Sequence, residues 1–216
     1  DRGYAMVSLD RRGRGNSGGP QQVFTDVGPD ACALIRWIRG QPWSDGRVAM
    51  RGGSYRGMTQ WMTAATCPEL VETMVPTAAV YPGEDFPRRG VHGSYAYVVR
   101  WLALTQGRTS NAKLFADDTY WERKFASAFR NYVPYAELDR HVGFSSPRFQ
   151  SWAAQLGDLP EFPGVTPTPE AYRAITMPVL TITGAYDGDQ AGALRYYREH
   201  AGTAGDAADG HFLLIG

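Results

Sequence analysis

The sequence predicts an α/β fold, with a parallel sheet that is covered by helices on both faces. Three observations lead to this prediction: short apolar segments recur along the 216 residues, helical patterns lie between them, and glycine-rich turns follow them. Nearly continuous apolar segments are typical of the buried strands of parallel sheets. Strands that alternate with helices favour parallel connections. The length is enough for one domain that carries an insert.

The first part of the chain contains three predicted strands and two predicted helices. The first strand, YAMVSLD, is a short apolar run that leads into a glycine-rich loop. Gly40 and Pro42 stop the first helix, in which apolar residues recur at helical spacing, and Pro68 ends the second. In chain order, the elements are a strand at 4–10, a helix within 26–41, a strand at 47–53, a helix at 54–67 and a strand at 71–80.

A helical insert is predicted after the third strand. Much of the aromatic content lies in it, and its helical patterns fall around 93–106, 111–129 and 147–156, before a proline-rich return. The alternation then resumes with a strand at 177–187, a helix at 191–200 and a strand at 211–216. We therefore expect an α/β core in two parts, 1–81 and 173–216, with a helical cap insert at 82–172.

The composition excludes some classes of partner. The 22 basic and 22 acidic residues cancel, so no overall charge would attract nucleic acid or an anionic membrane surface. No apolar run approaches the ~20 residues of a transmembrane helix. Cys32 and Cys67 have no metal-binding spacing, and the sequence does not decide whether they form a disulfide. The chain begins at Asp1 and ends within an apolar segment, so we expect a piece of a longer protein.

Two glycine-rich turns could carry chemistry. GRGNSG, at 13–18, matches G-x-G-x-x-G, which binds dinucleotides when its third glycine lies within the opening helix. Here Gly19 and Pro20 follow the third glycine, so a structural loop is favoured over a nucleotide site and over an oxidoreductase. The second turn, GGSYRG at 52–57, lies between a strand and a helix, as the nucleophile elbow G-x-S-x-G does. The alternative is a plain turn in which Ser54 caps the helix.

A nucleophilic serine requires an acid and a base. Asp187 follows the fourth strand at the end where parallel sheets form their ligand crevice, and Asp189 is the competing acid. His211 opens the last strand and His200 closes a helix, so both should lie at the opposite end. The insert contains the other two histidines, His92 and His141, and we expect the base beyond this chain.

The chain resembles the cocaine-esterase and X-Pro dipeptidyl-peptidase type of serine hydrolases. The segments that carry the resemblance are GYAMVSLDRRGRGNSGG, QPWSDGRVAMRGGSYRGMTQWMTAA, MPVLTITGAYDG and HFLLIG. It implies an α/β-hydrolase core with a helical cap, of which the first strands and a C-terminal jelly roll are absent here. It also implies Ser54 as nucleophile, Asp187 as triad acid and the Tyr55 N–H as half of the oxyanion hole. The second oxyanion donor, a tyrosine, and the histidine would lie outside residues 1–216, so this piece alone should be inactive.

One branch of this resemblance concerns substrate recognition. GEDFPRRGVHGSYAY is similar to a segment of the α-amino-acid ester hydrolases, in which carboxylates hold the substrate's α-ammonium group. Asp85 and Asp189 would match two of these carboxylates, and the third appears here as Gln190. The alternative is that Glu84 and Asp85 pair with Arg88 and Arg89. Trp101 either lines the acyl pocket or is a core aromatic residue.

The sequence thus predicts a serine hydrolase that cleaves an ester or amide acyl bond through an acyl-enzyme on Ser54. Amino-acyl esters are one candidate substrate class, and an X-Pro dipeptidyl aminopeptidase is an alternative. A binding protein that kept the hydrolase fold without turnover is a second alternative. We expect a small ester, amide or short peptide as partner, neither nucleic acid nor membrane, and no cofactor or metal.

Overall fold

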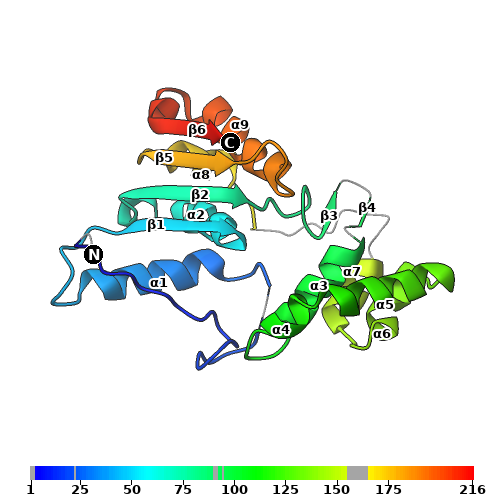
Figure 1. Cartoon of the computed structure of the whole chain (residues 1–216). Helices are drawn as coiled ribbons and strands as arrows, with labels where there is room; N and C mark the ends of the chain where they lie inside the picture. The colour runs from blue at the N-terminus through cyan, green and yellow to red at the C-terminus, as the bar shows by residue number, and fades with distance from the viewer. Residues whose placement is uncertain (1–2, 22, 90–91, 94, 155–164) are drawn as a thin grey trace. The chain divides into compact units, whose positions relative to one another are not determined.

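The computed structural model describes residues 3–21, 23–89, 92–93, 95–154 and 165–216 (Figure 1). Its contacts divide the chain into two compact units. The first unit comprises 1–8, 23–85 and 162–216, and the second comprises 9–22 and 86–161. The domain limits expected from the sequence stay a prediction. No helix in the described part of the chain is both long and apolar enough to span a bilayer.

A four-stranded parallel sheet forms the centre of the first unit (Figure 1). Its strands, in spatial order, are β1 (Ala49–Ser54), β2 (Thr73–Ala79), β5 (Val179–Thr183) and β6 (His211–Ile215). Each strand falls within or beside a predicted apolar segment, so four of the five predicted strands are confirmed. All four run in one direction, so their carboxyl ends lie at one edge of the sheet.

The strand predicted at 4–10 is wrong. These residues belong to no strand or helix, and Tyr4 and Met6 are 88% and 81% exposed. Among the described residues, β1 pairs with β2 and with no strand on its other side. A strand requires a neighbour for its backbone N–H and C=O groups, and an apolar pattern alone does not supply one.

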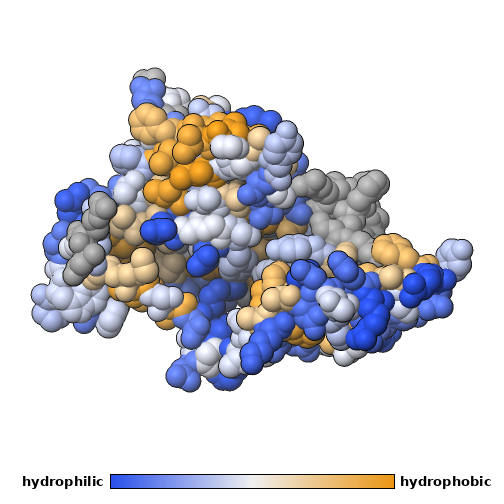
Figure 2. Space-filling view, viewed as in Figure 1, coloured by the Kyte–Doolittle hydropathy of each residue, from blue (hydrophilic) through white to orange (hydrophobic). Residues whose placement is uncertain are grey.

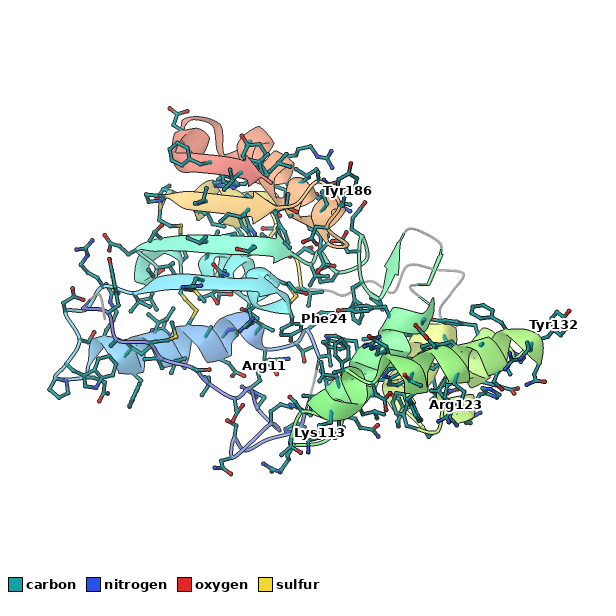
Figure 3. The ribbon with its side chains drawn as sticks, viewed as in Figure 1. Arg11, Phe24, Lys113, Arg123, Tyr132 and Tyr186 are labelled. Atoms are coloured by element: carbon teal, nitrogen blue, oxygen red, sulfur yellow. A yellow bond between two sulfur atoms is a disulfide. The ribbon has the colours of Figure 1, made fainter. Side chains whose placement is uncertain are left out.

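Four α-helices belong to the described part of the first unit: α1 (Val27–Arg39), α2 (Tyr55–Thr66), α8 (Pro169–Ala174) and α9 (Gln190–Ala204). α2 packs on β1 and β2, α9 packs on β2 and β5, and α1 lies against α2. Short 3₁₀ helices at Pro68–Leu70 and Gly205–Gly210 follow α2 and α9. The disulfide Cys32–Cys67 joins α1 to the residue that ends α2 (Figure 3).

The core of the first unit lies between these helices and one face of the sheet. Trp61 of α2 and Tyr196 of α9 stack with their ring centroids 5.0 Å apart, and both side chains are fully buried. Burial alternates along β5, so Val179 and Thr181 face this core. On the opposite face of β6, Phe212 and Leu214 are 61% and 53% exposed, and Figure 2 shows apolar residues gathered over these strands.

The second unit is helical, as predicted for the insert. It contains α3 (Tyr95–Thr105), α4 (Ala112–Phe115), α5 (Asp118–Arg130), η2 (Tyr135–Glu137), α6 (Leu138–His141), α7 (Pro147–Ala154) and a short hairpin of β3 (Arg88–Arg89) and β4 (His92–Gly93). α5 buries Trp121, Phe125 and Ala128 on one face, at helical spacing. The Asp117 side chain caps α5 by accepting the N–H of Tyr120.

The GRGNSG loop also belongs to the second unit, where it interlocks with residues 105–110. The Arg14 guanidinium donates to the carbonyl of Thr105 at 2.6 Å and to the Ser110 hydroxyl at 2.9 Å. In return, Arg108 donates to the carbonyls of Gly15 and Ser17. No helix opens in the loop, since α1 begins at Val27, and the contacts are those of a structural loop.

Candidate active site

Ser54 lies at a sharp turn between β1 and α2. It is the last residue of β1, α2 begins at Tyr55, and its backbone has φ 56° and ψ −121°. A residue with a side chain rarely adopts a positive φ, and such strain is concentrated at functional sites. The turn therefore has the backbone of a nucleophile elbow, in addition to its sequence pattern.

Small residues around Ser54 make this turn possible. A Cβ on Gly52 would lie 2.7 Å from the Cβ of Arg56. A Cβ on Gly57 would lie 2.7 Å from the Cβ of Ala79, because α2 passes close to the end of β2. The glycine that comes one place later than in G-x-S-x-G is thus explained by close packing of helix on strand.

Asp189 is the carboxylate that contacts Ser54. The Ser54 Oγ donates to Asp189 Oδ2 at 2.9 Å. Asp189 precedes α9, in the turn that follows β5, so both side chains lie at the carboxyl edge of the sheet. Asp187 belongs to the same turn, is exposed, and accepts the N–H of Asp189 at 2.8 Å. Its neighbour Tyr186 points into solvent beyond the end of β5 (Figure 3).

Tyr55 is anchored by its side chain. Its ring stacks on Phe24 with the centroids 5.6 Å apart, and its hydroxyl accepts the Phe24 N–H at 3.3 Å (Figure 3 labels Phe24). Its backbone N–H is at the first position of α2, where N–H groups have no intrahelical acceptor and the helix dipole is positive. The geometry is therefore suited to an oxyanion adjacent to Ser54. Phe24 was not expected from the sequence.

Asp85 is buried beneath this edge of the sheet. It is 5% exposed, Oδ1 accepts the N–H of Gly192 at 3.0 Å, and Oδ2 accepts the N–H of Tyr81 at 3.1 Å. The pKa of Asp85 is raised from 3.8 to about 6. Burial is the largest cause, the two hydrogen bonds act against it, and the negative charges of Asp189 and Glu84 add to the rise. Both Asp85 and Asp189 are thus part of one electrostatic site.

The comparison with known proteins agrees with this geometry. Residues 1–215 match the family described as X-Pro dipeptidyl-peptidase (S15 family). The chain belongs to the S15 family. The resemblance seen in the sequence is confirmed, and the predicted α/β-hydrolase fold is confirmed by the parallel sheet with its flanking helices.

Two relatives show how much of a longer protein the S15 chain matches. A cocaine esterase from Rhodococcus sp. (strain MB1 Bresler) is 39% identical over 104 residues, which are 47% of this chain and 18% of that protein. The structure of an aminopeptidase from the marine sediment archaeon Thaumarchaeota archaeon matches 96% of this chain and 36% of its own, with a TM-score of 0.67 and 21% identity. The matched part of the chain therefore spans less than a fifth of the length of the curated relative.

Two histidines of the S15 chain form a buried pair. The Nδ1 atoms of His200 and His211 are 2.9 Å apart, His200 Nε2 is 2.9 Å from the Ile175 carbonyl, and His211 Nε2 is 2.8 Å from the Thr181 hydroxyl. His211 pairs in register with Val179, at the start of β5 and thus opposite the Ser54 edge. In the second unit, His141 is hydrogen-bonded to Ser127 at 3.2 Å, and the side chain of His92 lies outside the described residues.

Glu84 and Trp101 both have partners other than a substrate. Glu84 pairs with Arg195 of α9 at 2.8 Å, whereas the side chains of Arg88 and Arg89 lie outside the described residues. Within the second unit, the ring of Trp101 lies 4.9 Å from that of Phe86, a contact typical of a core aromatic residue. Its place in an acyl pocket stays a prediction.

Proposed function

We propose that the protein is a serine hydrolase that cleaves an ester or amide acyl bond through an acyl-enzyme on Ser54. The observation that carries the proposal is the position of Ser54, in a left-handed turn at the start of α2, with a carboxylate 2.9 Å from its hydroxyl. Membership of the S15 family supports the same chemistry.

In the proposed reaction, a histidine outside the described residues removes the proton from Ser54 Oγ. Ser54 attacks the acyl carbonyl, and the Tyr55 N–H stabilises the oxyanion by about 3 kcal/mol, the usual contribution of one such donor. Asp187 orients the histidine, which then gives the proton to the leaving group. Water attacks the acyl-enzyme with the same histidine as base and releases the acid. The buried pair His200 and His211 is unsuited to this role because each ring is hydrogen-bonded within the core.

The substrate class that we propose has a free amino group near the scissile acyl bond. The support is the Asp189 carboxylate, which contacts Ser54 and lies near the buried Asp85. Two neighbouring carboxylates at the nucleophile favour a cationic group and disfavour an anionic one. Both α-amino-acyl esters and peptides with a free N-terminus fit this description, so the X-Pro aminopeptidase is kept as the second candidate.

The test of the proposal is covalent labelling of the full-length protein with a fluorophosphonate probe. We expect Ser54→Ala to abolish labelling, since the probe reacts only with an activated serine. Ser44→Ala is the matched control, because Ser44 lies in the turn before β1, where its hydroxyl accepts the Gly46 N–H. That control should label as the wild type does.

Two results would count against the proposal. Labelling that persists in Ser54→Ala would show that the nucleophile is another residue. A wild-type protein that never labels would favour the binding protein on a hydrolase fold.

A further inference from the structure

The residue at the start of α9 does not cap its own helix. Asp189 is the N-cap residue, and aspartate there usually accepts an N–H of the first helical turn. Here its side chain makes no cap hydrogen bond. Its Oδ2 accepts the Ser54 hydroxyl at 2.9 Å instead. The first turn of α9 must therefore find another acceptor.

That acceptor is Asp85, which comes from a distant part of the chain. The N–H of Gly192, the third residue of α9, donates to Asp85 Oδ1 at 3.0 Å across a separation of 107 residues. The other oxygen is held by its own turn, where it accepts the Tyr81 N–H at 3.1 Å. Both oxygens of this carboxylate are thus engaged by backbone N–H groups, and its side chain is buried.

Gly192 permits this contact. A Cβ on Gly192 would lie 1.7 Å from Asp85 Oδ2 and 2.6 Å from the Tyr81 backbone nitrogen, so no side chain fits there. α9 and the 81–85 turn are also joined one turn further along the helix. Arg195 pairs with Glu84 at 2.8 Å and covers the Tyr81 ring at 4.3 Å. The approach of the turn to α9 is therefore fixed at several points.

We infer that Asp85 caps α9 in place of Asp189. Because Asp85 provides this cap, the Asp189 carboxylate stays turned to Ser54. Asp85 is then a positioning residue, which acts through Asp189, and not the carboxylate that meets the substrate's amino group. The inference rests on the proposed function, because it names which of the two carboxylates selects the substrate. Without Asp85, the Asp189 side chain would turn back to the N–H groups of its own helix.

Selectivity for the amino group separates this role from others. The full-length protein is assayed with the p-nitrophenyl ester of an amino acid and with its N-acetyl analogue, and the ratio of the two kcat/KM values is compared. We expect both Asp85→Ala and Asp189→Asn to lower the ratio at least tenfold. The double variant should show no further fall, because Asp85 acts through Asp189.

Two other outcomes would overturn the inference. A direct contact between Asp85 and the amino group would make the two losses multiply in the double variant. A merely structural role would lower both kcat/KM values alike and leave the ratio unchanged. Thr168→Ala is the matched control, since Thr168 is the ordinary cap of α8 and accepts the Ala171 N–H at 3.2 Å. We expect it to lower the melting temperature without changing the ratio.

A second variant serves if Asp85→Ala does not fold, and a second measurement serves if turnover is absent. Gly192→Ala should displace Asp85 while leaving both carboxylates in the chain, and it should lower the same ratio. Crystal structures of Asp85→Ala and Gly192→Ala should show the Asp189 carboxylate accepting an N–H of α9's first turn. An Asp189 that still accepts the Ser54 hydroxyl in both would overturn the inference. Loss of Ser54 labelling in the wild type would instead refute the proposed function.

Discussion

The positive φ of Ser54 depends on the glycines around it. Gly57 matters most, because it lies where α2 crosses the end of β2 and has no room for a methyl group. A larger residue there must push α2 and β2 apart, and the turn that holds Ser54 leads directly into α2. The strain at Ser54 is thus maintained by packing and not by the turn alone.

We expect Gly57→Ala to lower the free energy of unfolding by about 1–3 kcal/mol, as overpacking of a tight contact does. It should also slow fluorophosphonate labelling of Ser54, because the elbow shifts. Urea unfolding and the labelling rate measure the two effects. Gly202→Ala is the control: Gly202 lies in α9 with nothing within 4 Å of an added Cβ. That change should stabilise the protein by about 0.5–1 kcal/mol. Equal behaviour of the two variants would contradict the packing argument.

At this scale the sequence predicted the serine and not its contacts. Ser54 was found because small residues mark a strained turn. The contact between Ser54 and Asp189 depends on a rotamer choice at a helix start, which no local pattern encodes. The cap from Asp85 to Gly192 joins segments 107 residues apart. A glycine in the first turn of an otherwise ordinary helix was the one available signal for it.

Among the elements, α9 and β6 are joined by the buried pair of His200 and His211. A carbonyl only accepts, so His200 Nε2 carries the hydrogen that it donates to Ile175. In the neutral ring His200 Nδ1 is then an acceptor, His211 Nδ1 is the donor, and His211 Nε2 accepts from the Thr181 hydroxyl. With both rings neutral, as their lowered pKa values indicate, this chain of hydrogen bonds assigns one tautomer to each ring.

Acid should therefore destabilise the first unit. Burial, and then the neighbouring His200, lower the pKa of His211 to about 3, and burial lowers the pKa of His200. The unfolded chain takes up these protons first, so their contribution is complete above about pH 6.5 and is lost as the pH falls toward 3. Each group adds a slope of up to about 1.4 kcal/mol per pH unit. Asp85 has the opposite sign, since its raised pKa favours the folded state as the pH falls below about 6.

Urea unfolding between pH 4 and pH 7 measures this slope. The variant His211→Gln removes one titrating ring and should reduce the slope. His141→Gln removes a histidine of the second unit, which is hydrogen-bonded to Ser127, and should leave it as it is. The same slope in the wild type and in His211→Gln would contradict the assignment of two neutral rings.

Most elements could be predicted because each has a complete local signal. The helices around 27–39 and 190–204 have periodic apolar faces and recognisable ends. The segment 4–10 has the pattern of a strand and is none, since a strand is defined by its neighbour. A local pattern shows that a segment can form a strand, and pairing with a neighbouring strand decides whether it forms one.

For the molecule as a whole, the disulfide joins α1 to the end of α2, two helices that are separated in the chain by β1. Cys32 and Cys67 are the two cysteines of the chain, and both are 1% exposed. The bridge closes a loop with a sequence separation of 35. In the chain-entropy account, closing a loop of this length lowers the entropy of the unfolded chain and so raises the free energy of unfolding by about 4 kcal/mol.

We therefore expect a reducing agent to lower the melting temperature of the protein, and the free energy of unfolding to fall by about 4 kcal/mol. Calorimetry with and without the reductant measures the change. The double variant Cys32→Ser, Cys67→Ser should melt at the lower temperature under both conditions. If reduction of the bridge leaves the melting temperature of the wild type unchanged, the bridge contributes nothing to stability.

The closed loop also contains the whole of β1 and α2, with Ser54 between them. A protease that nicks the exposed turn at 43–46 would cut this ring once without separating its two halves. On a gel run without reductant the nicked chain would migrate as one band, and thiol would resolve it into two. Ser54 is thus held covalently from both sides of its turn, even after one peptide bond of the loop has been cut.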